Sequence, residues 1–252
     1  MSIGNLGPEG WALLIVAPAI GSFLGVVIRR LPEGQPILWA RSRCEGCGAI
    51  LTPRDLVPLI SWVLAGRRCR HCGDRIGWFY PGVEIAALLV ALIALAVDAM
   101  PRAALDCLLG WWLLALAGID LRRWLLPDPL TLPLIVAGLA ASAVLDPTAL
   151  LDRTLGAIFG YLALRAIAAA YRALRRREGL GQGDAKLLAA AGAWVGASAL
   201  PQVILLAALA ALLAAAALHL RGIRLQLHSA LSFGPFLALA MWLIWLAGPF
   251  PV

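Results

Sequence analysis

Long apolar runs alternate with short polar segments along most of the chain. Eight runs approach the roughly 17–25 apolar residues that a membrane-spanning helix needs, and they lie near 10–28, 83–99, 102–120, 127–145, 150–172, 184–200, 202–219 and 230–248. Apolar and polar positions do not alternate within these runs, which favours helices over the strands of a barrel. The pattern therefore predicts an all-α polytopic membrane protein with about eight transmembrane helices.

One long polar segment, 29–82, interrupts this pattern directly after the first apolar run. It is too long for an ordinary connection between neighbouring spans. We therefore expect three parts: a first transmembrane helix within 1–28, a small polar domain at 29–82, and a membrane domain of seven helices at 83–252.

Composition and charge support this interpretation and suggest an orientation. Hydrophobic residues make up 62% of the chain and charged residues 14%, which excludes an ordinary soluble or disordered protein. If 29–82 is cytoplasmic, 18 of the 21 basic residues lie in or next to cytoplasmic loops, and both termini lie outside. This distribution explains the net charge of +7 without binding to nucleic acid. Besides nine arginines of 29–82, the cytoplasmic group is Arg122, Arg123, Arg172, Arg175, Arg176, Arg177, Lys186, Arg221 and Arg224.

Four of the five cysteines form two CxxC pairs inside the polar segment. These pairs are Cys44 with Cys47 and Cys69 with Cys72, separated by 21 residues. Four thiolates at this spacing can close a tetrahedral site, so we expect one structural Zn²⁺. Gly46, Gly48 and Gly73 suit the tight turns of such a site. The alternatives are two redox dithiols or disulfides, which a cytoplasmic location disfavours.

Two acidic residues at the ends of apolar runs are candidates for catalysis. Asp120 ends the third run, and Asp184 follows Gly181 and Gly183 at the start of the sixth. Acidic groups at membrane depth are costly and are often functional. Two carboxylates at the same depth could form an aspartyl-protease dyad that shares one proton. The alternative, that each acid only caps a helix or pairs with an arginine, is equally compatible with the topology.

The remaining acidic residues in or near the apolar runs suggest structural roles. Asp128 could cap the fourth run, Asp106 could pair with Arg165, and Glu84 begins the second run. A mid-run cysteine, Cys107, is expected to be a buried packing thiol. The sequence has no HExxH motif for a catalytic zinc.

Ten short motifs in a fixed order resemble the bacterial type IV prepilin peptidases. Each motif alone is weakly specific, but the order of all ten is highly specific. They are 21–24 (GSFL), 26–28 (VVI), 31–32 (LP), the tetracysteine motif that the two CxxC pairs form together, 80–84 (YPGVE), 119–120 (ID), 125–133 (LLPDPLTLP), 178–187 (EGLGQGDAKL), 192–194 (GAW) and 233–236 (FGPF).

The resemblance implies an aspartyl peptidase of the GxGD type with Asp120 and Asp184 as its catalytic pair. It also implies that the membrane domain is the peptidase domain and that the enzyme resides in the bacterial inner membrane. The implied substrates are type IV prepilins and type II secretion pseudopilins, cleaved at the cytoplasmic membrane face. The new N-terminus would then be methylated from S-adenosylmethionine. The sequence leaves the oligomeric state open.

Two positions depart from the family pattern, and both belong to the part associated with methyl transfer. Gly25 stands where asparagine is usual, and Arg30 stands where tyrosine is usual. Two alternatives therefore stay open: a peptidase without methyltransferase activity, or a transporter with a zinc-bound cytoplasmic domain.

Overall fold

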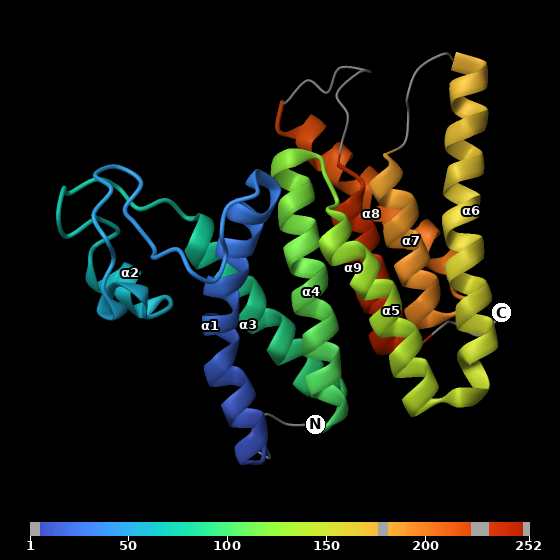
Figure 1. Cartoon of the computed structure of the whole chain (residues 1–252), viewed down its shortest axis with the longest axis horizontal. Coiled ribbons are helices and arrows are strands. Elements are labelled where there is room, and N and C mark those ends of the chain that lie inside the picture. The colour runs from blue at the N-terminus through green and yellow to red at the C-terminus, as the bar shows by residue number, and fades with distance from the viewer. Residues whose placement is uncertain (1–5, 176–180, 223–231, 249–252) are drawn as a thin grey trace. The chain divides into compact units, whose positions relative to one another are not determined.

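The described part of the chain is a bundle of apolar helices with one segment of loops. The computed structural model describes residues 6–175, 181–222 and 232–248 (Figure 1). This confirms the predicted all-α class. The helices are α1 (Pro8–Arg30), α2 (Ile60–Leu64), α3 (Phe79–Val97), α4 (Arg102–Arg123), α5 (Asp128–Leu145), α6 (Leu150–Arg175), α7 (Gln182–Val195), α8 (Leu200–Leu220) and α9 (Gly234–Ala247).

Each predicted apolar run corresponds to one helix, but the helices are not equally long. Within the described residues, six helices are long and apolar enough to cross a membrane: α1, α3, α4, α5, α6 and α8. Helices α7 and α9 have 14 residues each, or about 21 Å, against a hydrocarbon core of about 30 Å. The sequence overestimated α7 because this helix ends at Gly196, whose φ of +88° interrupts an apolar run that continues beyond it.

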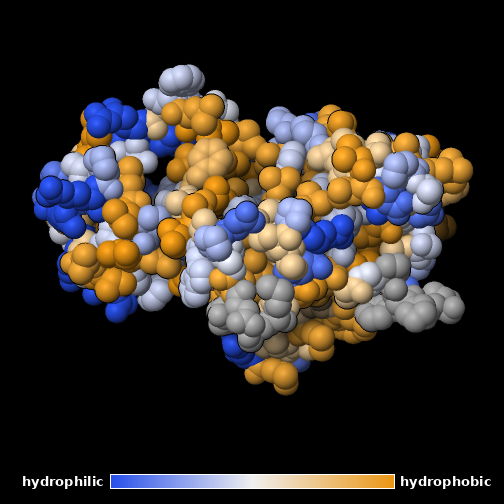
Figure 2. Space-filling model, turned by 90° about the horizontal axis from the view of Figure 1, so that it is seen from below, coloured by the Kyte–Doolittle hydropathy of each residue, from blue (hydrophilic) through white to orange (hydrophobic). Residues whose placement is uncertain are grey.

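Exposed hydrophobic side chains cover the long helices, as expected for helices that face lipid. Figure 2 shows broad hydrophobic areas on the helices and hydrophilic residues gathered where the loops between α1 and α3 lie. Basic residues occupy the last turns of α1 and α4, which agrees with the positive-inside pattern. Three of the basic residues, Arg176, Arg177 and Arg224, lie outside the described residues. Two positions of the 178–187 motif, Glu178 and Gly179, also lie outside them.

The chain divides into two compact units, Met1–Ala115 and Leu116–Val252, which are described separately. In the first unit, α1 packs alongside α3. Small residues form the shared core together with the start of α4, and Cys107 is a buried member, as predicted. The indole N–H of Trp111 donates to the carbonyl of Ala87 at 2.9 Å and ties α4 to α3.

Two glycines of α1 permit its close approach to α3. A Cβ atom on Gly21 would lie 2.5 Å from the Cα of Glu84. A Cβ atom on Gly25 would lie 2.7 Å from the ring of Tyr80. Both distances are shorter than carbon atoms tolerate. Glycine therefore replaces asparagine at position 25 where the Tyr80 ring occupies the space of a side chain.

Arg30, the second departure from the family pattern, fastens the loop that follows α1. Its guanidinium donates to the carbonyl of Pro36 at 3.2 Å and to that of Ala40 at 2.9 Å. The neutral side chain that is usual here could not donate to both carbonyls in this way.

In the second unit, α7 packs against α5, α6, α8 and α9. Its residues from Leu187 to Trp194 are buried, so it is the central helix of this unit. The close approach of α6 and α7 depends on Gly156 and Gly192, since a Cβ atom on Gly192 would collide with the Gly156 carbonyl. The indole N–H of Trp194 donates to the Leu134 carbonyl of α5 at 2.9 Å.

Two findings concern the other acidic residues, and the second corrects an expectation. Asp106 pairs with Arg102, one turn earlier on α4, at 3.3 Å. A partner four residues away on the same helix is within direct reach. The predicted pair with Arg165, which belongs to the second unit, stays a prediction. Asp128 is the first residue of α5, whose N-cap is Pro127, and it pairs with Lys186.

We predict that Gly25→Asn lowers the thermal stability of the detergent-solubilised protein, because the new side chain must displace the Tyr80 ring. Overpacking of this kind costs about 1–3 kcal/mol. Gly82→Ala is the matched control, since a Cβ atom there meets nothing within 4 Å. Equal melting temperatures for the Gly25→Asn variant and the unmodified protein would contradict the packing explanation.

Candidate functional site

The two candidate catalytic acids lie at helix ends that meet in the second unit. Asp120 belongs to the last turn of α4, and Asp184 is the third residue of α7. Figure 1 shows that α4 ends, and α5, α7 and α9 begin, at the upper end of this bundle. Both carboxyl groups line one cavity of about 940 Å³. The structure therefore brings together the two acids that the sequence singled out.

Asp120 is buried and is held by the start of α9. Only 6% of the residue is exposed. The hydroxyl group of Ser232 and the N–H group of Gly234, at 3.1 Å, both donate to Oδ2 of Asp120. A Cβ atom on Gly234 would collide with the same carboxylate oxygen, so only glycine allows this approach. The two donors leave Oδ1 of Asp120 as the oxygen that can carry or receive a proton.

Asp184 is held by the first turn of its own helix. The N–H group of Gly181, the N-cap of α7, donates to the Asp184 carboxylate, as an acid three residues into a helix commonly accepts from the N-cap. The carboxyl groups of Asp184 and Asp120 are close enough to interact electrostatically. Because two neighbouring carboxylates repel each other, such a pair tends to share one proton.

The rest of this cavity is largely apolar. Its walls include Leu125, Leu126, Leu164, Ile167, Ile204, Phe233 and Leu237. Gly183 packs against Leu126, where a Cβ atom would lie 2.8 Å from the leucine. The ion pair of Lys186 with Asp128 is the charged part of the wall. An apolar segment bound in this cavity would lie next to the carboxyl groups of Asp120 and Asp184.

Sequence reasoning missed Ser232 and the role of Gly234. In the sequence, FGPF at 233–236 stands out only as part of the family pattern, and Ser232 lies just before it. A signal was available, because a polar residue and a Gly-Pro pair open an otherwise apolar helix. N–H groups near a helix start have no intrahelical partner, so they can hold a carboxylate.

The four candidate metal ligands lie together in the first unit. The ligand atoms of Cys44, Cys47, Cys69 and Cys72 all lie within 4.8 Å of one another. The sulfur atoms of Cys44 and Cys72 are 3.8 Å apart. Tetrahedral zinc with Zn–S bonds of about 2.3 Å requires sulfur atoms about 3.8 Å apart. The cluster can hold a metal, and its geometry fits the predicted set of four thiolates.

Two matching turns hold the four sulfur atoms in place. In the first, the N–H of Cys44 donates to the Ala49 carbonyl and the N–H of Gly48 donates to the Cys44 carbonyl. Cys69, Gly73 and Asp74 repeat this pattern in the second turn. Gly48 and Gly73 have φ values of +71° and +73°, which glycine adopts without strain.

Backbone donors favour the ligand form of one cysteine. The N–H groups of Cys47 and Gly46 donate to the sulfur of Cys44 and lower the pKa of this thiol to about 7. A thiolate is the form that binds metals. His71 is exposed and lies outside the cluster of ligand atoms.

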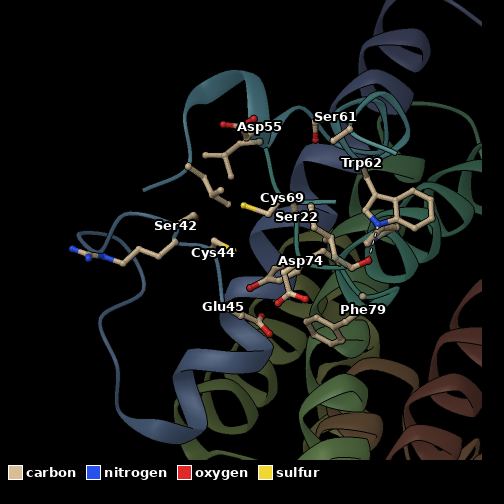
Figure 3. Close-up of a pocket in the computed structure, with 18 of the residues that line it drawn as sticks. Ser22, Ser42, Cys44, Glu45, Asp55, Ser61, Trp62, Cys69, Asp74 and Phe79 are labelled. Atoms are coloured by element: carbon tan, nitrogen blue, oxygen red, sulfur yellow. Dashed lines mark hydrogen bonds between the residues drawn. The ribbon is translucent and has the colours of Figure 1, made fainter. Parts of the chain in front are cut away.

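A second cavity, of about 240 Å³, lies beside the cysteine cluster in the first unit. Figure 3 shows the labelled residues Ser22, Glu45, Trp62 and Phe79 around it. Arg29 pairs with Glu45 and lies 5.1 Å above the Phe79 ring. This cavity therefore has aromatic walls and a charged rim.

Asp55 helps to fix the loop that covers this cavity. The side chain and the backbone N–H of Thr52 donate to the Asp55 carboxylate and hold its pKa below the usual value. Arg70 pairs with the same carboxylate at 3.4 Å. The loop before α2 is thereby joined to the second cysteine turn.

Comparison with known proteins identifies the family. Residues 15–97 match the family described as bacterial peptidase A24 N-terminal domain, and residues 107–216 match the type IV leader peptidase family. A prepilin leader peptidase/N-methyltransferase of Dickeya chrysanthemi is 39% identical over 95% of this chain and 94% of its own length. This chain belongs to the type IV leader peptidase family.

Other members of the family are similarly close. Proteins with the same name from Burkholderia pseudomallei strain 1026b and Pseudomonas aeruginosa are 39% and 36% identical. Their matches cover 92% and 93% of this chain and 84% and 89% of the relatives. No solved structure matches the chain. The family resemblance stated from the ten motifs is confirmed, and the chain is a multi-pass enzyme of the bacterial inner membrane.

We predict that the purified protein carries one metal ion per chain and that Cys44→Ser with Cys72→Ser removes it. Removing two of four thiolates leaves too few ligands for a closed site. Cys107→Ser is the matched control, because this cysteine is buried among apolar residues in the first unit. Elemental analysis of the three proteins provides the measurement. Full metal content in the double variant would contradict the assignment.

Proposed function

We propose that the chain is a prepilin leader peptidase and N-methyltransferase whose peptidase site is the pair Asp120 and Asp184. The observation that carries the proposal is that both carboxyl groups line one cavity, with Asp120 held by Ser232 and Gly234. The transporter alternative is set aside because the chain belongs to a peptidase family and aligns with its members over most of its length.

The pair would cleave a peptide bond with a water molecule as the nucleophile. One carboxylate takes a proton from water, which attacks the peptide carbonyl, while the protonated partner donates a hydrogen bond to the carbonyl oxygen. Asp184 lies at a helix N-terminus, where the dipole favours the anion, so we assign it the role of base. Asp120 would then carry its proton on Oδ1, since Oδ2 accepts two hydrogen bonds.

The lining of the cavity is consistent with prepilins and pseudopilins as substrates. Its apolar wall can accept the start of a hydrophobic segment, while the carboxyl groups reach the bond that precedes it. We propose that this end of the bundle faces the cytoplasm, because basic residues end α4 beside the site. A basic leader would remain on that side, and membrane lipid would surround the remaining helices.

We assign the metal of the four cysteines as Zn²⁺ with a structural role. Four thiolates leave no open coordination position for catalysis. The surrounding segment is small and consists mostly of loops, so its folding would depend on the metal.

The relatives' name also supports methylation of the new N-terminus, with S-adenosylmethionine as the donor. The donor supplies an electrophilic methyl group, and this chain must supply a site for the amine that accepts it. Both departures from the family pattern have a structural explanation, since Gly25 serves helix packing and Arg30 holds a loop. We therefore retain both activities.

We predict that Asp120→Asn and Asp184→Asn each abolish prepilin cleavage, because an amide can neither activate water nor exchange the shared proton. Cleavage of a purified prepilin by each detergent-solubilised variant, followed by mass spectrometry, provides the measurement. Asp146→Asn is the matched control, since Asp146 is exposed in the loop after α5. Asp128→Asn and Asp106→Asn should have smaller effects. Retained turnover in either variant of the pair would refute the assignment.

We predict that Ser232→Ala lowers the rate of cleavage by about tenfold or more, because Asp120 loses one of two donors that orient it. A buried acceptor that is left without its donor costs about 1–3 kcal/mol. Ser232→Thr keeps a hydroxyl group and should recover part of the rate. The pH dependence of cleavage should shift in Ser232→Ala and not in Ser232→Thr. An unchanged rate and pH profile in Ser232→Ala would show that the contact does not matter.

A further inference from the structure

Glu84 is a buried carboxylate with two neutral partners. It lies near the start of α3, and only 5% of the residue is exposed. The N–H of Leu59 donates to its Oε2 at 2.8 Å, and the side chain of Ser22 supplies the second hydrogen bond. A buried acidic group is normally paired with a cation. Among the described residues, no hydrogen bond or ion pair joins the Glu84 carboxylate to a cation.

One cation of the same cavity, Arg29, is already engaged. Arg29 lines the same cavity as Glu84, but its guanidinium pairs with Glu45 and stacks on two aromatic rings. Its distances to the centroids of the Phe79 and Tyr80 rings are 5.1 and 5.3 Å. The lining also includes six further basic residues, and none of the contacts described for them reaches Glu84: Arg30, Arg43, Arg68, Arg70, His71 and Arg75. An ammonium group brought by a ligand can therefore pair with Glu84.

The cavity in front of Glu84 suits a small organic cation. Phe79, Tyr80 and Trp62 contribute aromatic surface to its lining. Aromatic faces attract cations, and these rings already carry the guanidinium groups of Arg29 and Arg67. Figure 3 shows Ser22, Trp62 and Phe79 on different sides of this cavity. Its volume of about 240 Å³ is enough for the end of an extended peptide but not for a folded domain.

We propose that Glu84 binds the new N-terminal ammonium group of the cleaved pilin and acts as the base for its methylation. The inference rests on the proposed N-methyltransferase function. The α-amino group has a pKa near 7.7–8.0, so it arrives largely protonated and needs a base. Glu84 takes one proton, and the nitrogen lone pair attacks the methyl carbon of S-adenosylmethionine. The carbon–sulfur bond breaks with its electron pair going to sulfur, which yields S-adenosylhomocysteine and a methylammonium group.

A purely structural role is the alternative for Glu84. Leu59 has a positive φ of 59° and precedes α2, so the carboxylate could serve only to hold this turn. Glu84→Gln separates the two roles. The amide oxygen of glutamine can still accept from Leu59 and Ser22, whereas the negative charge and the base are lost.

The test compares the whole protein with its Glu84→Gln variant by two measurements. The first is calorimetric binding of a short peptide with the sequence of the mature pilin N-terminus, either with a free amine or N-acetylated. The second is mass spectrometry of a prepilin incubated with and without S-adenosylmethionine, which reads cleavage and methylation separately. Glu9→Gln is the matched control, because Glu9 is exposed in the first turn of α1.

We expect the unmodified protein and Glu9→Gln to bind the free-amine peptide at least tenfold more tightly than the acetylated one. Glu84→Gln should lose this preference and at least 90% of the methylation rate, while it cleaves at the normal rate and keeps its metal. Tenfold is the size expected for a charge-assisted hydrogen bond.

Two results would overturn the proposal: unchanged amine preference and methylation in Glu84→Gln, or a joint loss of metal, cleavage and methylation that marks a structural anchor. Failure of the proposed function itself would look different. In that case the unmodified protein would leave the cleaved pilin unmethylated, while the peptide measurement would still report whether Glu84 binds an amine.

Discussion

A carboxylate buried in an apolar helix bundle needs hydrogen-bond donors, and Asp120 obtains two of them from the start of α9. Neither donor is charged, so the carboxylate is oriented without being neutralised by a salt bridge. The contact also explains why α9 begins with Gly234, because a larger residue would push the carboxylate away. The position of α9, the shape of the cavity and the approach of Asp184 all depend on this arrangement.

Small residues allow the helix backbones to approach one another closely. Without a hydrophobic difference between lipid and side chain, helices in a membrane associate through close packing. Gly21 brings α1 against α3 beside Glu84, and Gly156 with Gly192 brings α6 against α7. In each unit, the closely packed pair includes the helix that carries a buried or catalytic carboxylate. Close packing therefore fixes the positions from which the carboxylates act.

The sequence predicted most of the helices, the cluster of four cysteines and the two acids of the cavity, because apolar runs, CxxC pairs and intramembrane acids are local signals. It failed on two points. Helix α7 ended earlier than its apolar run because of Gly196. The second point is a contact between distant segments. The hydroxyl of Ser232 reaches Asp120 across 112 positions of sequence, which no local pattern encodes.

The two buried carboxylates held by neutral donors, Asp120 and Glu84, differ in what faces them. Asp120 faces a second carboxyl group, so a proton is the cation that the pair can share, and this suits hydrolysis by an activated water molecule. Glu84 faces a cavity lined by aromatic rings and by several arginines, none of which contacts it among the interactions described, so the proposed partner is the ammonium group of the cleaved pilin. Both carboxylates are thus buried with neutral hydrogen-bond donors, but their neighbours differ. The neighbours of Asp120 favour a shared proton, which suits hydrolysis, and those of Glu84 favour an organic cation, which suits methylation.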